Sequence, residues 1–475
     1  MSDHETQELG RAIEEIWEIG RRLGLDPFPT HFEVVPAAIM YEFGAYGLPG
    51  RFSHWTHGKA YHQMKMMYDY GLSKIYELVI NTNPCYGFLM ETNSMVQNKL
   101  VIAHVMGHCD FFKNNVYFGH TSRQMIETAS VNADRIRSYE FDHGEREVEE
   151  FLDAVLAIQE HIDPHVHLRQ PPTDNGDERG RRRRQPEGPY DDLWKLEERG
   201  KPAPSEEERG RRRLPEQSEK DILGFLMAHA PELEEWQRDV IGIVREEMLY
   251  FLPQMQTKIM NEGWASFWHA RILRELELTD DEYVEFSQLN AGVLSPSPSK
   301  RSINPYYVGI KVWEDILRRW DNPTEEERRL LGREPNQGLA KIFEVRELEN
   351  DVSFLRNYLT ADLVEELDLY VYELQDDEWV IVEKDWEKTR DMLVQSMTNM
   401  GYPVLHVEDG DYRGNRELYL RHAFEGRELD IAYAEKAMQH VYKLWGRAVH
   451  LETVVDNEPV LMTYDGHENS ARTLT

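Results

Sequence analysis

The sequence predicts a mainly α-helical protein with one small β-hairpin and an α+β domain at the C-terminal end. Three patterns predict this class. Apolar residues recur at helical spacing over most of residues 5–372, and two short apolar runs surround a turn near Pro84. From residue 378 onward, strand-like and helix-like segments alternate. At 475 residues, 40% of them hydrophobic, the chain is long enough for two or three domains with buried cores.

The N-terminal part is expected to begin with an amphipathic helix over residues 5–24. The runs "IYELVIN" and "CYGFLMET" flank "TNP" and predict two strands around a turn. Ser94 and Gln97 then form an S-x-x-Q capping box, which predicts the start of a helix over residues 94–113. Further helices are expected at 122–138 and 144–162.

A break in composition divides the helical region. Residues 171–219 are rich in Pro, Gly and charge, so we expect a disordered insert between two parts of one helical domain, residues 1–170 and 220–376. Its Arg runs suggest a docking tag for an acidic partner or RNA, but a solvated, self-neutralising insert is the favoured interpretation. After the insert, helices broken near Pro253 are expected.

The last part of the chain is expected to form a separate domain, residues 377–475. Its predicted elements alternate between strands and two helices, beginning with the strand "EWVIVEK" and ending with the strand "PVLMTYD". We interpret this order as a small α+β domain with a ferredoxin-like arrangement.

Charge and targeting signals limit the function classes. The chain has 87 acidic and 54 basic residues and a net charge of −33, which argues against a general binder of nucleic acid or anionic membranes. The acidic excess suggests a halophilic host. Two cysteines, no apolar signal core and no apolar run of about 18 residues predict a soluble, cytoplasmic protein.

The segment "AHVMGHCDFF" is the strongest chemical signal, because it sets His104 and His108 four residues apart on the predicted helix. This face also carries Val101, Phe111 and Phe112, so both rings are expected inside an apolar stripe. A buried ring without a hydrogen bond costs roughly 1 to 3 kcal/mol. A metal ion or another side chain must therefore face them.

A second predicted helix, "KIMNEGWASFWHARIL", supplies a complement. Glu262 and His269 lie on one stripe, and Gly263 permits a close helix approach. We predict that His104, His108 and Glu262 bind a divalent metal, with zinc favoured and iron or manganese as alternatives. His269 is the predicted catalytic acid or base.

Two interpretations that involve no metal site stay open at this point. Paired core histidines bonded to carbonyl groups, and an exposed Glu–His ion pair, would give the same spacings. Asp110 and Cys109 are expected to point away from the metal face. Other candidates are interpreted as solvated, loop or structural side chains, namely Glu246, Glu247, His161, His165, His167, His54, His57 and His62.

Three blocks closely resemble the SpoVR family of stage V sporulation protein R-like proteins, and the similarity extends from about residue 5 to 470. They are "NPCYGFLMETNSMVQNKLVIAHVMGHCDFFKNN", "QRDVIGIVREEMLYFLPQMQTKIMNEGWASFWHARIL" and "INPYYVGIKVWEDI". The resemblance implies a sporulation or stress pathway shared with a PrkA-type serine protein kinase and a von Willebrand factor A-like protein.

The site is also similar to that of gluzincin metallopeptidases, which predicts a zincin-like core. Their paired histidines correspond to His104 and His108, and their distal glutamate corresponds to Glu262. Val105 stands where the glutamate of HExxH acts as general base, and losing a positioned base typically costs about 10² to 10⁴ in rate. Two hypotheses follow. The protein is a metal-dependent hydrolase-like enzyme, or it is a non-catalytic interaction protein working with the kinase and the von Willebrand factor A-like protein.

Overall fold

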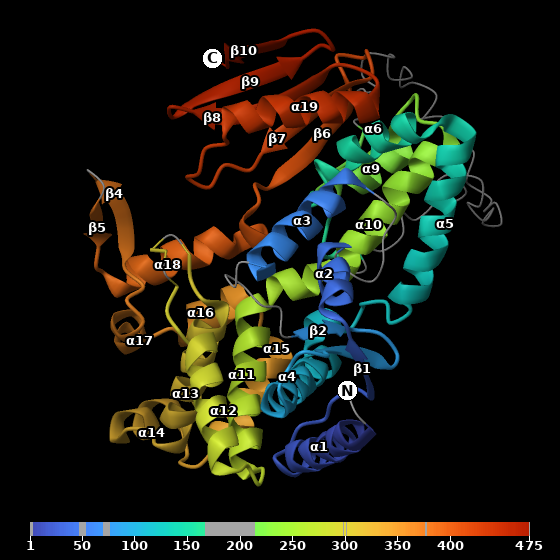
Figure 1. Cartoon of the computed structure of the whole chain (residues 1–475). Coiled ribbons are helices and arrows are strands. Elements are labelled where there is room, and N and C mark those ends of the chain that lie inside the picture. The colour runs from blue at the N-terminus through green and yellow to red at the C-terminus, as the bar shows by residue number, and fades with distance from the viewer. Residues whose placement is uncertain are drawn as a thin grey trace, which may run out of the picture. The chain divides into compact units, whose positions relative to one another are not determined.

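The computed structural model describes residues 3–46, 54–69, 77–166, 214–297, 299–300, 302–375 and 378–474. The chain forms two compact units (Figure 1). Unit 1 comprises Met1–Glu149 and Leu249–Tyr402, and unit 2 comprises Glu150–Met248 and Pro403–Thr475. Most of the predicted insert, residues 171–213, lies outside the described residues. Across the described ranges, no helix has both the length and the apolar character needed to cross a bilayer.

Unit 1 is mainly helical, as the sequence predicts. Its helices are α1 (Asp3–Arg22), α2 (Ala37–Tyr46), α3 (Trp55–Asp69), α4 (Met95–Asn114), α5 (Met125–His143), α11 (Lys258–Glu275), α12 (Asp280–Val293), α13 (Pro305–Asp321), α14 (Glu325–Leu331), α15 (Gly338–Leu348), α16 (Asp351–Tyr358), α17 (Ala361–Glu366) and α18 (Trp386–Met397). Two further helices, α6 (Glu145–Leu156) and α10 (Glu235–Gln256), contain residues at which the units divide. Pro253 lies inside α10, and the helical break follows it at Thr257.

The predicted hairpin of unit 1 is confirmed. Strands β2 (Glu77–Ile80) and β3 (Cys85–Met90) pair antiparallel. A strand not predicted from the sequence, β1 (Thr30–Val35), pairs parallel with β3, so the sheet order is β1-β3-β2. The capping box that begins α4 is also confirmed, because the Ser94 side chain accepts from the Gln97 N–H and the Gln97 side chain accepts from the Ser94 N–H.

A second small sheet of unit 1 consists of β4 (Val371–Gln375) and β5 (Glu378–Glu383). Thus the strand predicted from residue 378 and the helix after it fold with the helical unit. Unit 2, which contains the largest sheet, resumes at Pro403. The domain limits drawn from the sequence stay a prediction.

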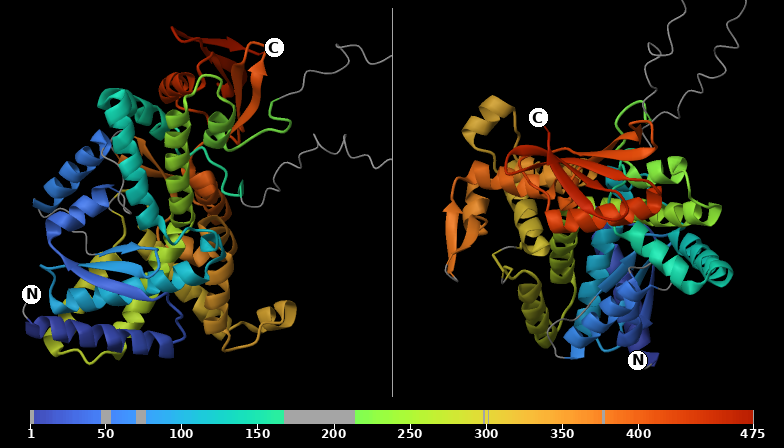
Figure 2. Two further views of the ribbon diagram at one scale, coloured as in Figure 1. Left: turned by 90° about the vertical axis from the view of Figure 1, so that its right-hand side faces the viewer. Right: turned by 90° about the horizontal axis from the view of Figure 1, so that it is seen from above.

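Unit 2 contains the five-stranded sheet, in the order β10-β9-β8-β7-β6. The helix α19 packs against β8 and β9 on one face of this sheet (Figures 1 and 2). The strands are β6 (Leu405–Tyr412), β7 (Glu417–His422), β8 (Val449–Val455), β9 (Glu458–Tyr464) and β10 (Asn469–Thr473), and the helices are α9 (Ile222–His229) and α19 (Ile431–Trp445). The element order is β-β-α-β-β-β, whereas a ferredoxin-like domain has β-α-β-β-α-β. The ferredoxin-like expectation therefore does not describe this sheet, because its first predicted strand and helix belong to unit 1.

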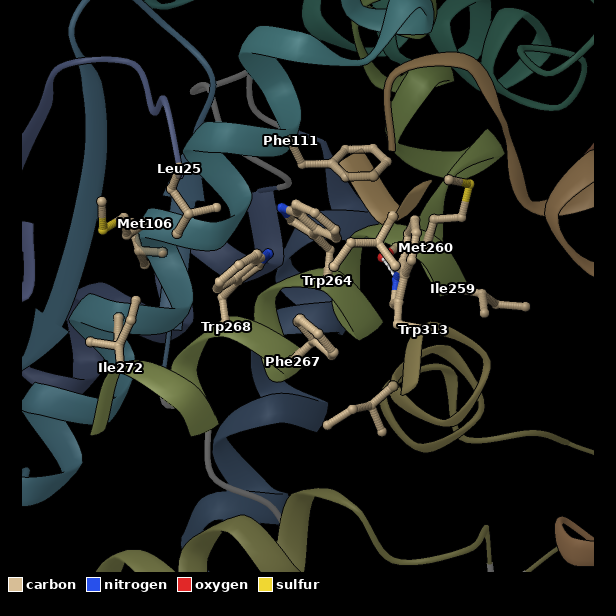
Figure 3. Packing of buried hydrophobic residues seen from close by; sticks show 14 of the residues in the cluster. Leu25, Met106, Phe111, Ile259, Met260, Trp264, Phe267, Trp268, Ile272 and Trp313 are labelled. Atoms are coloured by element: carbon tan, nitrogen blue, oxygen red, sulfur yellow. Dashed lines mark hydrogen bonds between the residues drawn. The ribbon is translucent and has the colours of Figure 1, made fainter. Parts of the chain in front are cut away.

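The core of unit 1 is built around α4 and α11. Every residue of α4 from Leu100 to Phe112 is buried, which is why its apolar periodicity is weak. Three tryptophans pack in the same core, with ring centroids of Trp264 and Trp268 5.5 Å apart and of Trp264 and Trp313 5.0 Å apart (Figure 3). The indole N–H of Trp313 donates to the Met260 carbonyl at 3.1 Å.

Small residues allow these helices to approach closely. A Cβ added at Gly107 of α4 would lie 2.7 Å from the Cα of Ala265 on α11. A Cβ at Gly263 would lie 2.4 Å from the backbone of Gly309 on α13. The prediction that Gly263 permits close helix approach is confirmed, with α13 as the neighbour that it accommodates.

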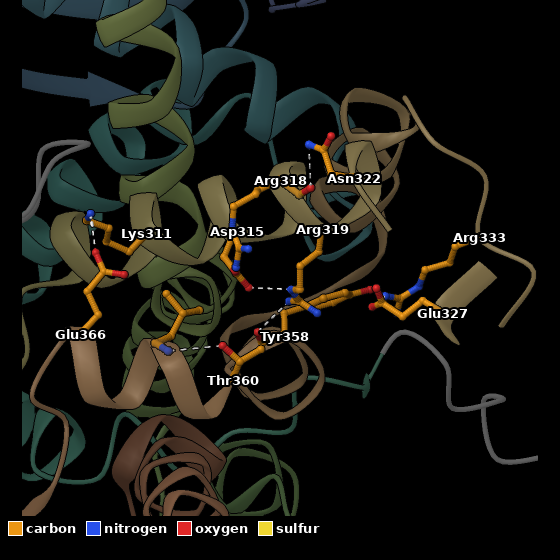
Figure 4. Close-up of polar contacts among 11 residues, drawn as sticks. Lys311, Asp315, Arg318, Arg319, Asn322, Glu327, Arg333, Tyr358, Thr360 and Glu366 are labelled. Carbon is orange, nitrogen blue, oxygen red and sulfur yellow. Dashed lines mark hydrogen bonds and ion pairs between the residues drawn. The ribbon is translucent and has the colours of Figure 1, made fainter. Parts of the chain in front are cut away.

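Polar contacts hold the outer helices in place. The Asp315 carboxylate of α13 accepts from Arg319 Nε at 2.6 Å, and Arg319 Nη2 donates to the Tyr358 carbonyl of α16 at 3.1 Å (Figure 4). Lys311 pairs with Glu366 of α17 at 2.7 Å. The N-terminal end of α11 is capped by Asp351, whose oxygens each accept a backbone N–H at 2.9 Å.

The contact at Gly107 gives a first prediction. Gly107→Ala should destabilise the folded chain by about 1 to 3 kcal/mol, because the new methyl meets the backbone of α11 and forces the helices apart. Gly10→Ala is the matched control, since a Cβ at this position in α1 meets nothing within 4 Å. It should stabilise the chain by up to about 1 kcal/mol. Thermal and urea unfolding measure both changes, and equal effects would contradict the close approach.

Candidate metal centre

The three predicted metal ligands lie together in the structure. Helix α4 presents His104 and His108, and α11 presents Glu262 from the opposite side. The distance from Glu262 Oε2 is 3.5 Å to His104 Nε2 and 3.5 Å to His108 Nε2. Both imidazoles are buried, and the Glu262 side chain is 17% exposed.

A fourth residue, Glu77 of β2, completes this cluster and was not predicted. Its Oε1 lies 3.2 Å from His104 Nε2. One ligand atom from each of the four residues can be chosen so that all lie within 4.8 Å of one another. The signal in the sequence was a single carboxylate in the otherwise apolar strand "ELVI". One acidic residue in a four-residue strand does not indicate which face of the sheet it occupies.

Hydrogen bonds fix the orientation of His104. Its Nδ1 lies 2.8 Å from Nδ1 of His269, whose Nε2 lies 2.9 Å from the Asn290 carboxamide oxygen. That oxygen can only accept, so His269 donates from Nε2 and accepts at Nδ1. His104 therefore donates from Nδ1, which leaves its Nε2 facing the carboxylates.

The same logic applies to His108. Its Nδ1 lies 2.9 Å from the Asn261 carboxamide oxygen and so donates to it. Both rings thus have one nitrogen committed to a partner in the surrounding protein and turn the other toward Glu262. This is the arrangement found around histidines that bind metals, where the outer hydrogen bond sets the tautomer and the ring orientation.

The four residues fit a divalent ion. A tetrahedral ion with bonds of about 2.0 to 2.1 Å has ligand atoms separated by roughly 3.3 to 3.4 Å. The three measured separations, 3.2, 3.5 and 3.5 Å, lie near this value. In addition, His104 Nε2 and Glu262 Oε2 are buried, and within the described chain neither makes a hydrogen bond of normal geometry. Both atoms therefore have a lone pair that can coordinate a metal ion.

Burial and the neighbouring charged groups shift the pKa values of the His104 imidazole and the Glu262 carboxyl in opposite directions. Burial lowers the pKa of the His104 imidazole, but the carboxylates of Glu77 and Glu262 outweigh it and raise this pKa from 6.5 to about 9. Burial favours neutral Glu262, yet its close polar contacts with the imidazoles of His104 and His108 hold its pKa well below the ordinary range. Burial, with the charge of His104, lowers the pKa of His269 to about 3, which agrees with a neutral ring that accepts at Nδ1.

A cavity of about 1100 Å³ opens beside the cluster and is lined by Glu77, His104, His269 and Tyr306, among others. The ring centroid of Tyr306 lies 5.9 Å from that of His104. Burial, together with the Glu262 and Glu77 carboxylates, raises the pKa of the Tyr306 phenol far above its usual value. Tyr306 is therefore a neutral hydroxyl donor at the edge of the cavity. It is a second site residue that the sequence analysis missed.

Residues near the signature helix that were expected to point elsewhere do so. Asp110 is fully buried and pairs with Arg346 at 2.7 Å and with the Trp264 indole at 2.9 Å. Cys109 accepts from the Thr30 hydroxyl at 3.1 Å. Val105 is fully buried in the core.

The less specific candidates do not join the cluster. Glu246 is exposed and Glu247 is buried, and the structure places neither among the possible metal ligands in the described residues. The same holds for His161, His165, His54, His57 and His62, whereas His167 lies outside the described residues.

Comparison with known proteins assigns the family. The family description "SpoVR like protein" matches residues 3–402, and "SpoVR-like C-terminal domain" matches residues 403–456. The chain belongs to the SpoVR family. A relative in Escherichia coli (strain K12), named "Uncharacterized protein YcgB", is 31% identical over 472 residues, which span 93% of this chain and 90% of that protein. No solved structure matches the chain. The resemblance inferred from the three blocks is thus confirmed, and the second family description begins where unit 2 resumes, at Pro403.

The raised pKa of His104 gives a second prediction, for the metal-free protein. Because the folded pKa of about 9 exceeds 6.5, protonated His104 contributes stability that is fully present below pH 6.5 and is lost as the pH rises through 9. The loss should be on the order of 3 kcal/mol. Urea unfolding with a chelator present measures it, and His104→Gln should remove the difference. A wild-type stability that changes no more than that of His104→Gln between pH 6.5 and 9 would contradict this charge assignment.

Proposed function

We propose that this SpoVR protein is a metal-dependent hydrolase-like enzyme whose divalent ion, with zinc favoured and iron or manganese as alternatives, is bound by His104, His108 and Glu262. The observation that carries the proposal is the convergence of two oriented Nε2 atoms and the buried Oε2 atom of Glu262 at separations suited to one ion. A cavity beside the cluster gives a substrate access to it.

The surrounding residues have distinct proposed roles. When bound, the ion supplies Lewis acidity and lowers the pKa of a coordinated water. Glu77 accepts a proton at Oε1, the task that an HExxH glutamate performs and that Val105 cannot perform. Tyr306 donates a hydrogen bond from its neutral hydroxyl to an oxygen on which negative charge develops.

His269 is better suited to positioning than to the acid or base role that the sequence suggests. Both of its ring nitrogens have partners, one in His104 and one in Asn290. A proton transfer would require it to give up one of these hydrogen bonds. We therefore propose that His269 holds the tautomer and orientation of His104.

The order of these elements also supports a gluzincin-like core as a proposal. A strand, a helix with two histidines four residues apart, and a later helix with a glutamate occur in the same sequence order as in that class. The difference lies in the base, which comes from β2 in place of α4. We propose a zincin-like arrangement modified at this position.

A second proposal is favoured by Val105, whose burial leaves α4 without the carboxylate of a peptidase. In this case the protein is an interaction partner of the PrkA-type serine protein kinase and the von Willebrand factor A-like protein in a stress or sporulation pathway, and the metal centre is structural. A folded His104→Ala variant that keeps its role in cells would favour this second function.

Metal analysis of the purified protein tests the first proposal. The wild type should retain about one divalent ion per chain, and His104→Ala and Glu262→Gln should each weaken its binding by about 100-fold or more, since outer hydrogen-bond partners alone contribute 10- to 100-fold. His31→Ala is the matched control, because His31 pairs with Glu33 at 3.6 Å on the surface. A wild type without metal after loading and dialysis would end this proposal.

The role of Glu77 can be separated from that of a ligand. Glu77→Gln should weaken metal binding by less than about tenfold, because three ligands remain, and should lower any hydrolytic rate by about 10² to 10⁴. Calorimetric titration with zinc gives the first quantity. If Glu77→Gln loses the ion as completely as Glu262→Gln, Glu77 is a fourth ligand and not the base.

A further inference from the structure

A second cavity lies next to the one at the metal centre. It has a volume of about 410 Å³, and the two cavities share Pro296, Ser297, Ile303 and Asn304 in their walls. The second cavity extends to the start of β4, where Val371 and Tyr372 line it. The two cavities therefore adjoin along these shared residues, one beside the candidate metal centre and the other beside the β4–β5 hairpin.

This space exceeds what a small molecule needs. Pockets for drug-sized ligands usually measure about 300 to 1,000 Å³. The first cavity alone has about 1100 Å³, and the second adds about 410 Å³. A chain that passes through both would use this volume, whereas a compact metabolite would leave much of it to water.

The hairpin beside the second cavity exposes apolar side chains on both faces. Leu374 and Trp379 are cross-strand partners on one face and are 47% and 39% exposed. Val380 and Val382 lie on the other face and are 40% and 43% exposed. A two-stranded sheet is marginally stable by itself, so such a hairpin gains from a partner that covers it.

The hairpin also offers hydrogen bonds and charge. In the described sheet, β4 has β5 as its only strand neighbour, so its other edge has backbone N–H and C=O groups without a strand partner. The described residues of the two strands include Glu373, Glu378 and Glu383 but no Lys or Arg. An extended polypeptide with alternating apolar and basic side chains matches the exposed apolar side chains, the strand edge and the acidic charge of the hairpin. Its amide groups repeat at the strand period, as pairing with a strand edge requires.

We infer that this protein binds an extended, unstructured polypeptide along the β4–β5 hairpin, with one end reaching the metal centre through the two cavities. The inference rests on the proposed function, since it names the substrate class of the same site. Main-chain pairing with β4 supplies affinity, and apolar side chains cover Trp379 or Val380. An oligosaccharide lacks the amide repeat and is a distinct outcome of the test.

The test uses the zinc-loaded full chain and hydroxamate-terminated peptides, N-acetyl-(Val-Lys)n-NHOH, with n from 1 to 4. At about 3.3 Å per residue, the longest peptide extends roughly 26 Å. Affinity should rise at least about tenfold from n = 1 to n = 4, as measured by calorimetry. Trp379→Asp should remove this gain and leave the affinity for n = 1 unchanged.

Matched controls make the result specific. Trp55→Asp changes a tryptophan on α3 that is more exposed, at 54%, and that lines neither cavity, and it should keep the gain. A peptide of n = 4 with alternate amides N-methylated should lose most of the gain, because it cannot pair with a strand edge.

Each outcome has one meaning. Equal affinity for all lengths, an unchanged gain in Trp379→Asp, or a similar gain with a hydroxamate-terminated oligosaccharide would overturn the inference while the metal centre stands. A wild type that fails to retain zinc would instead overturn the proposed function, and metal analysis before the titration reveals this.

Discussion

The close approach of α4 and α11 is the constraint on which the site depends. Gly107 and Ala265 allow the two backbones to meet, and Glu262 lies less than one turn before Ala265 on α11. A larger residue at either position would move Glu262 away from His104 and His108 by a fraction of an ångström or more, which matters when ligand bonds are about 2 Å long. The glycines of α11 and α13 impose a second contact of the same kind, so Glu262 is held between two tightly packed neighbours.

The buried charges near this contact divide into two groups with different consequences. Asp110 is satisfied by Arg346, the Trp264 indole and the Asp26 N–H, so it links α4, α11 and α15 without any ligand. Among the described residues, the carboxylates of Glu77 and Glu262 at the candidate metal centre pair with no cation other than protonated histidine. Burying them therefore opposes folding unless a proton or an ion compensates. An ion bound at this cluster would therefore stabilise the core.

The sequence predicted those features that one helix determines by itself. Spacing alone placed His104 and His108 on one face, and the capping box located the start of α4. It could not predict that His269, on the same stripe as Glu262, has its two ring nitrogens bonded to His104 and Asn290, and its catalytic role stays a prediction. Glu77 was missed because its partners come from two other elements. The helical region was predicted better than the C-terminal sheet, where the boundary between units falls within a run of similar elements.

In the proposed arrangement the carboxylate that serves as the base lies on a strand and not on the helix, so its position depends on the pairing of the sheet. In an HExxH helix, the base and both ligands share one rigid element. Here Glu77 is positioned by the pairing of β2 with β3, in which it lies opposite Leu89. A slip of one residue would turn Glu77 to the other face of the sheet and remove it from His104. The parallel partner β1 fixes β3 from its other side, which makes that register harder to change. Val105, at the position of the HExxH glutamate, is fully buried and packs against Gly87 in the core.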